Sequence, residues 1–112
     1  MFETAEQMAL EPRYLSMPDD RDITLPDVLN ALADPVRLQI VHELAEGGEV
    51  VCGALVVPVA VSTRSHHLRT LREAGLTRTR IVGTQRLVSL RRDSLDARFP
   101  GLLDAVVAAA SG

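Results

Sequence analysis

Lysine, tryptophan and long hydrophobic runs are missing from this sequence of 112 residues, and cysteine occurs once, at Cys52. A single thiol excludes an internal disulfide framework and fits a reducing compartment. No apolar run approaches the roughly 20 residues that span a membrane, and the acidic N-terminus lacks the basic start and apolar middle of a signal peptide. We therefore expect a cytoplasmic protein without a membrane partner.

Aromatic residues are also scarce, at 3%, although hydrophobic residues make up 46% of the chain. The core must therefore be built from leucine, valine, isoleucine and alanine. A chain of this length has room for one domain with one modest core. Because such a core is often completed by a second copy of the chain, we expect a homodimer.

The absence of lysine makes every cation a guanidinium, and these cations are unevenly distributed. Residues 62–92 carry eight arginines and one acid, Glu73, whereas the whole chain has a formal net charge of −3. Guanidinium pairs bidentately with phosphate and with the edges of guanine. A basic stripe confined to one part of an acidic protein indicates a polyanionic partner for that part, the plain alternative being a solvated arginine-rich surface.

Residues 1–22 are acidic, and we expect them to form a flexible N-terminal tail in front of a single domain at residues 23–112. Thr24 and Asp34 are suitable N-caps, and each is followed by a proline in the first helical turn. Together with apolar residues at helical spacing, these signals predict four helices. They are one after Thr24, one from Asp34 to Gly47, a short one over Val51–Val56 and one from a Ser62 cap to Gly75.

The apolar pattern then changes to a period of two over 77–81 and 86–90, which predicts a β-hairpin. Helical spacing returns after Asp93, with a break at Pro100-Gly101. The predicted fold is therefore mainly α with a small β-hairpin, in the order of a winged helix-turn-helix. In that fold the second helix of the pair enters the major groove of DNA, and the hairpin lies along the backbone or the minor groove.

The fourth helix has the surface that groove reading requires. With Leu68 and Leu71 on the core, its outward face holds short polar side chains and one long cation: Ser62, Thr63, His66, Arg69, Thr70 and Glu73. The hairpin region adds Arg78, Arg80, Arg86, Arg91 and Arg92. Arg64 falls on the apolar side of the helix, so either its stem lies along the core while its head reaches phosphate, or the helix has a different phase.

Three segments resemble the ArsR-type family of bacterial winged-helix regulators: LADPVRLQIVHELAEG (32–47), STRSHHLRTLREAGL (62–76) and GTQRLVSLRRDSLD (83–96). The resemblance implies a homodimer joined through its first and last helices, usually a repressor that a small inducer releases. It places the start of the recognition helix at Ser62 and the tip of the wing at 83–86. The expected DNA-binding residues are therefore Ser62, Thr63, Arg64, Ser65, His66, Arg69, Gln85 and Arg86.

The same resemblance, with the apolar sides of the first and last helices, predicts a dimer interface. Its expected residues are Leu25, Leu29, Phe99, Leu102, Leu103 and Val106. Some residues of the last helix could instead line a ligand cavity, and an unidentified small-molecule effector is a candidate partner.

The family's metal sites are incomplete in this chain. Members that sense arsenic or heavy metals carry Cys-Val-Cys where this chain has Val50-Val51-Cys52, and residues 93–112 contain no histidine for zinc or nickel. No nucleophile–base pair, phosphate-cradling glycine loop or pair of catalytic carboxylates can be made out, so we expect no enzyme, metal or cofactor. The prediction is a dimeric DNA-binding repressor. Two alternatives stay open: a metal-responsive sensor that uses Cys52 with ligands from the partner subunit, and a winged-helix module that binds protein.

Overall fold

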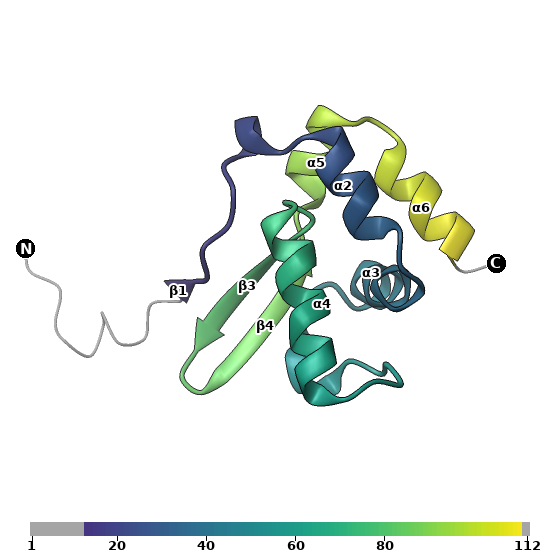
Figure 1. Cartoon of the computed structure of the whole chain (residues 1–112). Coiled ribbons are helices and arrows are strands. Elements are labelled where there is room, and N and C mark those ends of the chain that lie inside the picture. The colour runs from purple at the N-terminus through teal and green to yellow at the C-terminus, as the bar shows by residue number, and fades with distance from the viewer. Residues whose placement is uncertain (1–12, 111–112) are drawn as a thin grey trace, which may run out of the picture.

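The computed structural model describes residues 13–110 and shows five α-helices packed around a small antiparallel sheet (Figure 1). In chain order the elements are β1 (Arg13–Tyr14), the 3-10 helix η1 (Asp20–Asp22), α2 (Leu25–Leu32), α3 (Pro35–Gly47), β2 (Val50–Val51), the 3-10 helix η2 (Cys52–Ala54), α4 (Val61–Glu73), β3 (Thr77–Val82), β4 (Gln85–Leu90), α5 (Arg92–Arg98) and α6 (Leu102–Ala110). The prediction of a mainly helical fold with a small hairpin is confirmed. No helix in this part of the chain is long and apolar enough to cross a membrane.

The caps predicted for the first two helices are also confirmed. The Thr24 hydroxyl accepts a hydrogen bond from the backbone N–H of Asp27 at 3.3 Å. One carboxylate oxygen of Asp34 accepts from the backbone N–H groups of Val36 and Arg37, at 2.8 and 3.1 Å. The bond from Arg37, followed by that from Val36, lowers the pKa of Asp34. Since the first turn of a helix has N–H groups without partners, each cap fixes where its helix begins.

The prediction of a short helix over 51–56 is wrong. The chain instead forms β2 and then the three-residue η2. The reason is that Val50 and Val51 pair with Val88 and Leu87 of β4. Valine is β-branched and is favoured in a strand, so the available partner strand outweighs the helical pattern.

The predicted cap of the fourth helix is likewise wrong, although the helix itself is present. Ala60 is the N-cap of α4, no side chain caps it, and Ser62 lies within the helix. The first turn closes through the backbone, where the N–H of Arg64 donates to the carbonyl of Ala60 at 2.9 Å. Ser62 is therefore an exposed residue of the first turn of α4 and not its cap.

The predicted hairpin is the centre of a four-stranded antiparallel sheet with strand order β1-β3-β4-β2. β3 and β4 pair from Thr77 opposite Leu90 to Val82 opposite Gln85. Gly83 opens the two-residue turn with a φ of 60°, which glycine adopts without a Cβ clash. Because residues directly opposite each other share a face of the sheet, Thr79 and Arg86 both lie on the face toward α4, and Arg78 and Arg80 lie on the other.

Part of the expected N-terminal tail belongs to the folded domain. β1 pairs with β3, and residues 15–22 then run along the body of the protein (Figure 1). The anchor is Arg91, which is 4% exposed and donates to the carbonyl of Pro18 and to Oδ1 of Asp20, both at 2.7 Å. Ser94 donates to the same oxygen, and these contacts lower the pKa of Asp20, the Ser94 bond most strongly. The expectation of a tail fails for residues 13–22, and residues 1–12 lie outside the described part of the chain.

The predicted break in the last helical region is confirmed. α5 ends at Arg98, and α6 begins at Leu102 after Pro100 and Gly101, which has a φ of 83°. In Figure 1 the sheet lies on one side of α4, whereas α2, α3 and α6 lie on the other. The aliphatic core between them draws on both parts of the fold and contains Ile23, Val28, Ile40, Val41, Leu44, Leu71, Leu76, Val88, Leu95 and Leu103.

Gly75 joins α4 to β3 where the chain passes close to this core. Its φ is 90°, and a Cβ at this position would lie 2.5 Å from Cγ1 of Ile23, which is 1% exposed. Both the backbone conformation and the space therefore require glycine here. This junction fixes the angle between α4 and the hairpin.

We expect Gly75→Ala to lower the free energy of unfolding by about 2–5 kcal/mol, from the left-handed backbone and the overpacking against Ile23 together. Gly53→Ala is the matched control, because it has no positive φ and no heavy atom within 4 Å of the added Cβ. That control should change stability by less than about 0.5 kcal/mol. Urea unfolding measures both, and equal stability of the two variants would contradict the role of Gly75.

Candidate nucleic-acid interface

The start of α4 presents the polar side chains that the sequence assigns to DNA reading. Ser62, Thr63, Ser65 and His66 are all exposed, as is Arg69 one turn further on. Residues 62, 66, 69 and 73 recur at helical spacing and therefore share one face of α4. Hydroxyl, imidazole and guanidinium groups can all hydrogen-bond to base edges or phosphates.

Arg64 lies on a different side of α4 from Ser62 and His66, and it shares a crevice with Ser65 and Arg69. Leu68 and Leu71 are buried, as the helix phase predicted, and Arg64 is half-buried in a crevice between α4 and the hairpin. The buried Leu68 and Leu71 confirm the predicted helix phase, so a different phase does not explain Arg64. Arg64 lines the crevice together with Arg69, Arg72 and Arg86.

Three arginines of the basic stripe are paired with carboxylates of their own chain. Arg80 donates to Glu49 through Nε at 3.0 Å and through Nη2, which lowers the pKa of Glu49 and raises that of Arg80. Arg91 is buried against Asp20. Arg92 donates to Asp104 at 2.8 Å. The sequence counts these three among the cations of the hairpin region, and the fold shows that each has a carboxylate partner in its own chain.

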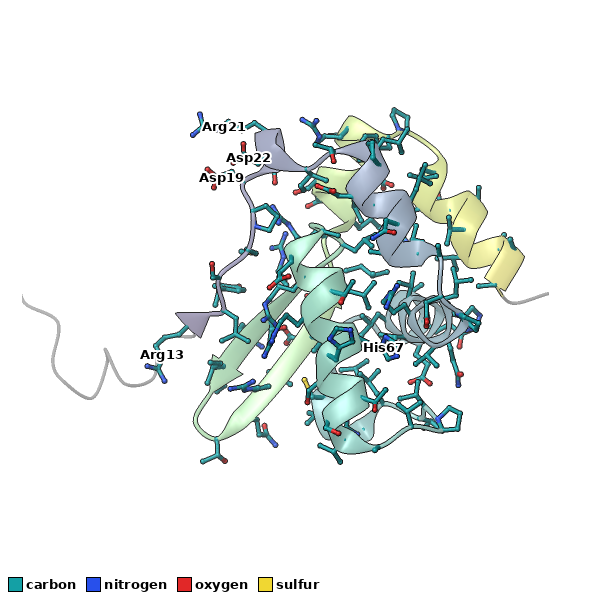
Figure 2. All side chains as sticks on the ribbon, in the orientation of Figure 1. Arg13, Asp19, Arg21, Asp22 and His67 are labelled. Carbon is teal, nitrogen blue, oxygen red and sulfur yellow. The ribbon has the colours of Figure 1, made fainter. Side chains whose placement is uncertain are left out.

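The remaining five arginines of the stripe have no carboxylate within ion-pairing distance among residues 13–110. Figure 2 shows nitrogen-bearing side chains gathered between α4 and the β3–β4 hairpin. Four of the five line the crevice, and Arg78 lies on the opposite face of the sheet. Gln85 and Arg86 are exposed where the hairpin turns. The unpaired arginines are Arg64, Arg69, Arg72, Arg78 and Arg86.

His67 holds α4 against α3 and does not belong to the exposed face of α4. It is 9% exposed, and Nη1 of Arg37 lies 3.1 Å from its Nδ1 (Figure 2). Nε of the same arginine donates to the carbonyl of Ala31, and the Asp34 cap accepts the Arg37 backbone N–H. Arg37 thus connects α2, the start of α3 and the middle of α4. The sequence analysis did not identify this contact, because it joins residues 30 positions apart.

Cys52 lies at the start of η2 and lines the same crevice as the arginines. Burial raises the pKa of the Cys52 thiol, and the nearby charges of Arg64, Arg86 and Arg72 partly oppose that shift. Within residues 13–110 of one chain, no group of three or more histidine, cysteine, aspartate or glutamate side chains could hold a metal ion. The cation-rich surroundings of Cys52 favour an anion over a metal ion.

The residues expected at a dimer interface divide into two sets. Leu25 and Leu29 of α2 are 42% and 48% exposed, and Phe99, Leu102 and Val106 are half-buried. Leu103, at 2% exposure, already belongs to the core of its own chain. The expectation that Leu103 forms part of the interface is therefore wrong, because Leu103 is buried within its own chain, where α6 packs against α3 and α5.

A helix-turn-helix followed by a β-hairpin, with a polar and cationic helix exposed beside the hairpin, defines a DNA-binding module of transcriptional regulators. Residues 32–80 match the model of a helix-turn-helix domain. The chain is also 36% identical to the uncharacterized HTH-type transcriptional regulator YceK of Bacillus subtilis (strain 168) over 94 residues, which are 81% of this chain and 94% of that protein. The chain belongs to the ArsR-like family of helix-turn-helix transcriptional regulators.

Family membership confirms three predictions made from the sequence. The protein is a DNA-binding regulator of transcription, it has the helix-turn-helix fold, and it is not an enzyme.

Sequence reasoning missed Arg72 as a member of the site. Its position eight residues after Arg64 places both on one side of α4, and this spacing could have identified it.

Proposed function

We propose that this regulator is a homodimeric repressor that places α4 in the major groove of duplex DNA and its β3–β4 hairpin along the backbone. The observation that carries the proposal is the sorting of the arginines. Arg80, Arg91 and Arg92 are paired with Glu49, Asp20 and Asp104, whereas the arginines on α4 and at the hairpin turn, together with Arg78, have no carboxylate partner among residues 13–110. Phosphate supplies the missing negative charge.

Within this arrangement the exposed start of α4 reads the bases. Ser62, Thr63 and His66 carry short side chains that reach base edges in the groove, and Ser65 and Arg69 lie beside them. Arg86 and Gln85 at the hairpin turn contact the backbone and supply affinity more than sequence preference. The protein acts on DNA in the cytoplasm, a reducing compartment in which a chain with a single cysteine is expected.

The dimer is formed through the apolar sides of α2 and α6. These helices lie side by side in Figure 1, and residues from both line one small apolar pocket. Leu25 and Leu29 on α2 are large aliphatic side chains that water contacts in the single chain. A two-fold interface through them removes this apolar surface from water and places two recognition helices about 34–36 Å apart, one turn of DNA. A dimer on such a site represses by blocking access to a promoter.

The charge around Cys52 argues against the metal-responsive alternative. A thiophilic metal site requires deprotonated thiolates and neutral or anionic neighbours. Burial raises the pKa of this thiol, and Arg64, Arg72 and Arg86 lie close enough to affect it. An organic or inorganic anion therefore fits the positive charge around Cys52 better than a metal ion does, and is the better candidate for an effector. The protein-binding alternative requires an apolar outward face on α4, and that face is polar.

Arg86→Ala should weaken binding to a selected duplex and to random duplex by a similar factor, roughly 10–100-fold for the two copies in a dimer, because it removes a phosphate contact. Arg80→Ala is the matched control, since Arg80 is paired with Glu49 on the other face of the sheet. It should change DNA affinity little. Fluorescence anisotropy with a duplex selected from a randomised pool measures both.

His66→Ala should act differently and reduce the preference for the selected duplex by about 1–3 kcal/mol per half-site. Equal losses for Arg80→Ala and Arg86→Ala, or no loss of preference for His66→Ala, would contradict the proposed orientation on DNA.

Leu29→Asp should convert the dimer to monomer, because the interface would bury an unpaired carboxylate. Val61→Asp is the control: Val61 is also apolar and 66% exposed, but it lies at the start of α4, where an acidic side chain favours the helix. It should remain dimeric while its DNA affinity falls. Sedimentation equilibrium measures the oligomeric state of both variants. A Leu29→Asp protein that stays dimeric would exclude α2 from the interface.

A further inference from the structure

The crevice between α4 and the hairpin is a cavity of about 260 Å³, slightly below the usual size of small-molecule sites. It is open to solvent on one side, and η2 and the segment after β1 complete its walls. Four arginines line it, with one cysteine, one serine, one threonine and two leucines. The lining residues are Leu15, Cys52, Arg64, Ser65, Leu68, Arg69, Arg72, Thr79 and Arg86.

No carboxylate of residues 13–110 lines this cavity, so the described part of the chain supplies no counter-charge for the four arginines. Arg64 and Arg72 are half-buried, whereas Arg69 and Arg86 are exposed. Burial lowers the pKa of Arg72, and its Nε atom is fully buried without a hydrogen-bond partner among the described residues. A buried, unpartnered N–H of a cation is costly unless a ligand accepts from it.

We propose that this crevice binds a small anion that carries a phosphate group, and that this anion competes with DNA for the protein. Guanidinium forks match phosphate oxygens in geometry as well as in charge, and the Ser65 hydroxyl is a further donor in the lining. The volume admits a ligand of pyrophosphate size. Four arginines in one small cavity suit a multiply charged anion better than a monoanion.

The inner and outer arginines give this site its proposed regulatory effect. Arg64 and Arg72 are the less exposed pair, whereas Arg69 and Arg86 are also expected to contact DNA phosphates. A bound anion neutralises the outer pair and thereby weakens DNA binding. This competition rests on the proposed DNA-binding function, but occupation of the crevice does not.

Cys52 allows occupation to be measured on the wild-type protein without DNA. The only thiol of the chain lines the cavity, so a ligand in the crevice shields it from alkylation by iodoacetamide. With inorganic pyrophosphate at about ten times its dissociation constant, the alkylation rate should fall about tenfold. Sodium chloride at matched ionic strength should give no such protection.

Arg72→Gln should reduce this protection at least fivefold, and Arg64→Gln serves the same purpose if the first variant does not fold. The ratio of rates with and without pyrophosphate is taken within each variant, which cancels changes in intrinsic thiol reactivity. Arg21→Gln is the matched control, because Arg21 is exposed and its only ion pair among residues 13–110 is with Asp19. It should retain the wild-type ratio.

Duplex DNA forms the second arm of the experiment. Pyrophosphate that protects Cys52 and also weakens DNA binding at least tenfold at constant ionic strength supports the proposal. If only duplex DNA protects Cys52, the crevice binds phosphates of the DNA backbone, and the proposal of a small ligand is overturned. If neither pyrophosphate nor duplex protects Cys52, the proposal is also overturned. Protection by pyrophosphate without effect on DNA affinity would overturn the competition. A protein that binds no duplex but is protected by pyrophosphate would refute the proposed function and leave the anion site established.

Discussion

Repulsion among guanidinium groups is the constraint on which the site depends. Arg64, Arg69, Arg72 and Arg86 surround one small cavity in which residues 13–110 place no carboxylate. Two like unit charges about 8 Å apart repel by about 0.5–2 kcal/mol at effective dielectric constants between water and a protein surface. The folded chain bears this cost, and an anion in the cavity would relieve it. The same arrangement that opposes folding therefore favours association with a polyanion.

The rest of the fold holds these charges in place. Arg37 connects the Asp34 cap, the end of α2 and His67, and so fixes α4 against α3. Arg91 ties Pro18 and Asp20 to the start of α5. The backbone N–H of Leu15 donates to the carbonyl of Thr79, which positions Leu15 as a wall of the crevice. Asp20, Asp34 and Glu49 all have lowered pKa values, because each accepts hydrogen bonds in the folded state. Their stabilising effect is present above the ordinary carboxyl pKa and is lost as the pH falls through the lowered values.

Local signals in the sequence predicted much of this fold, and contacts between distant residues account for most of the errors. Thr24 and Asp34 are caps whose effect reaches only the next three residues, so both helix starts could be predicted. Val50 and Val51 could not be assigned to a strand, because their partners lie in β4. The tail was misjudged for the same reason, since the partners of Arg91 lie more than 70 residues away.

The candidate site shows the same division. Helical spacing identified the exposed face of α4, and composition identified the basic stripe. Neither could show which arginines are neutralised, because Glu49, Asp20 and Asp104 lie outside the stripe and reach it only through the fold. The burial of Leu103 within its own subunit was hidden from the pattern in the same way, since helical spacing marks an apolar side without saying what covers it.

The dependence of DNA affinity on salt tests the central claim most directly, since it counts the phosphates that the unpaired arginines neutralise. If the two subunits together neutralise about 6–10 phosphates, the logarithm of the association constant falls linearly with the logarithm of salt concentration. The loss between 50 and 200 mM salt should then be about 10³–10⁵-fold. An affinity that hardly changes over this range would show that these arginines do not contact DNA phosphates and would contradict the account.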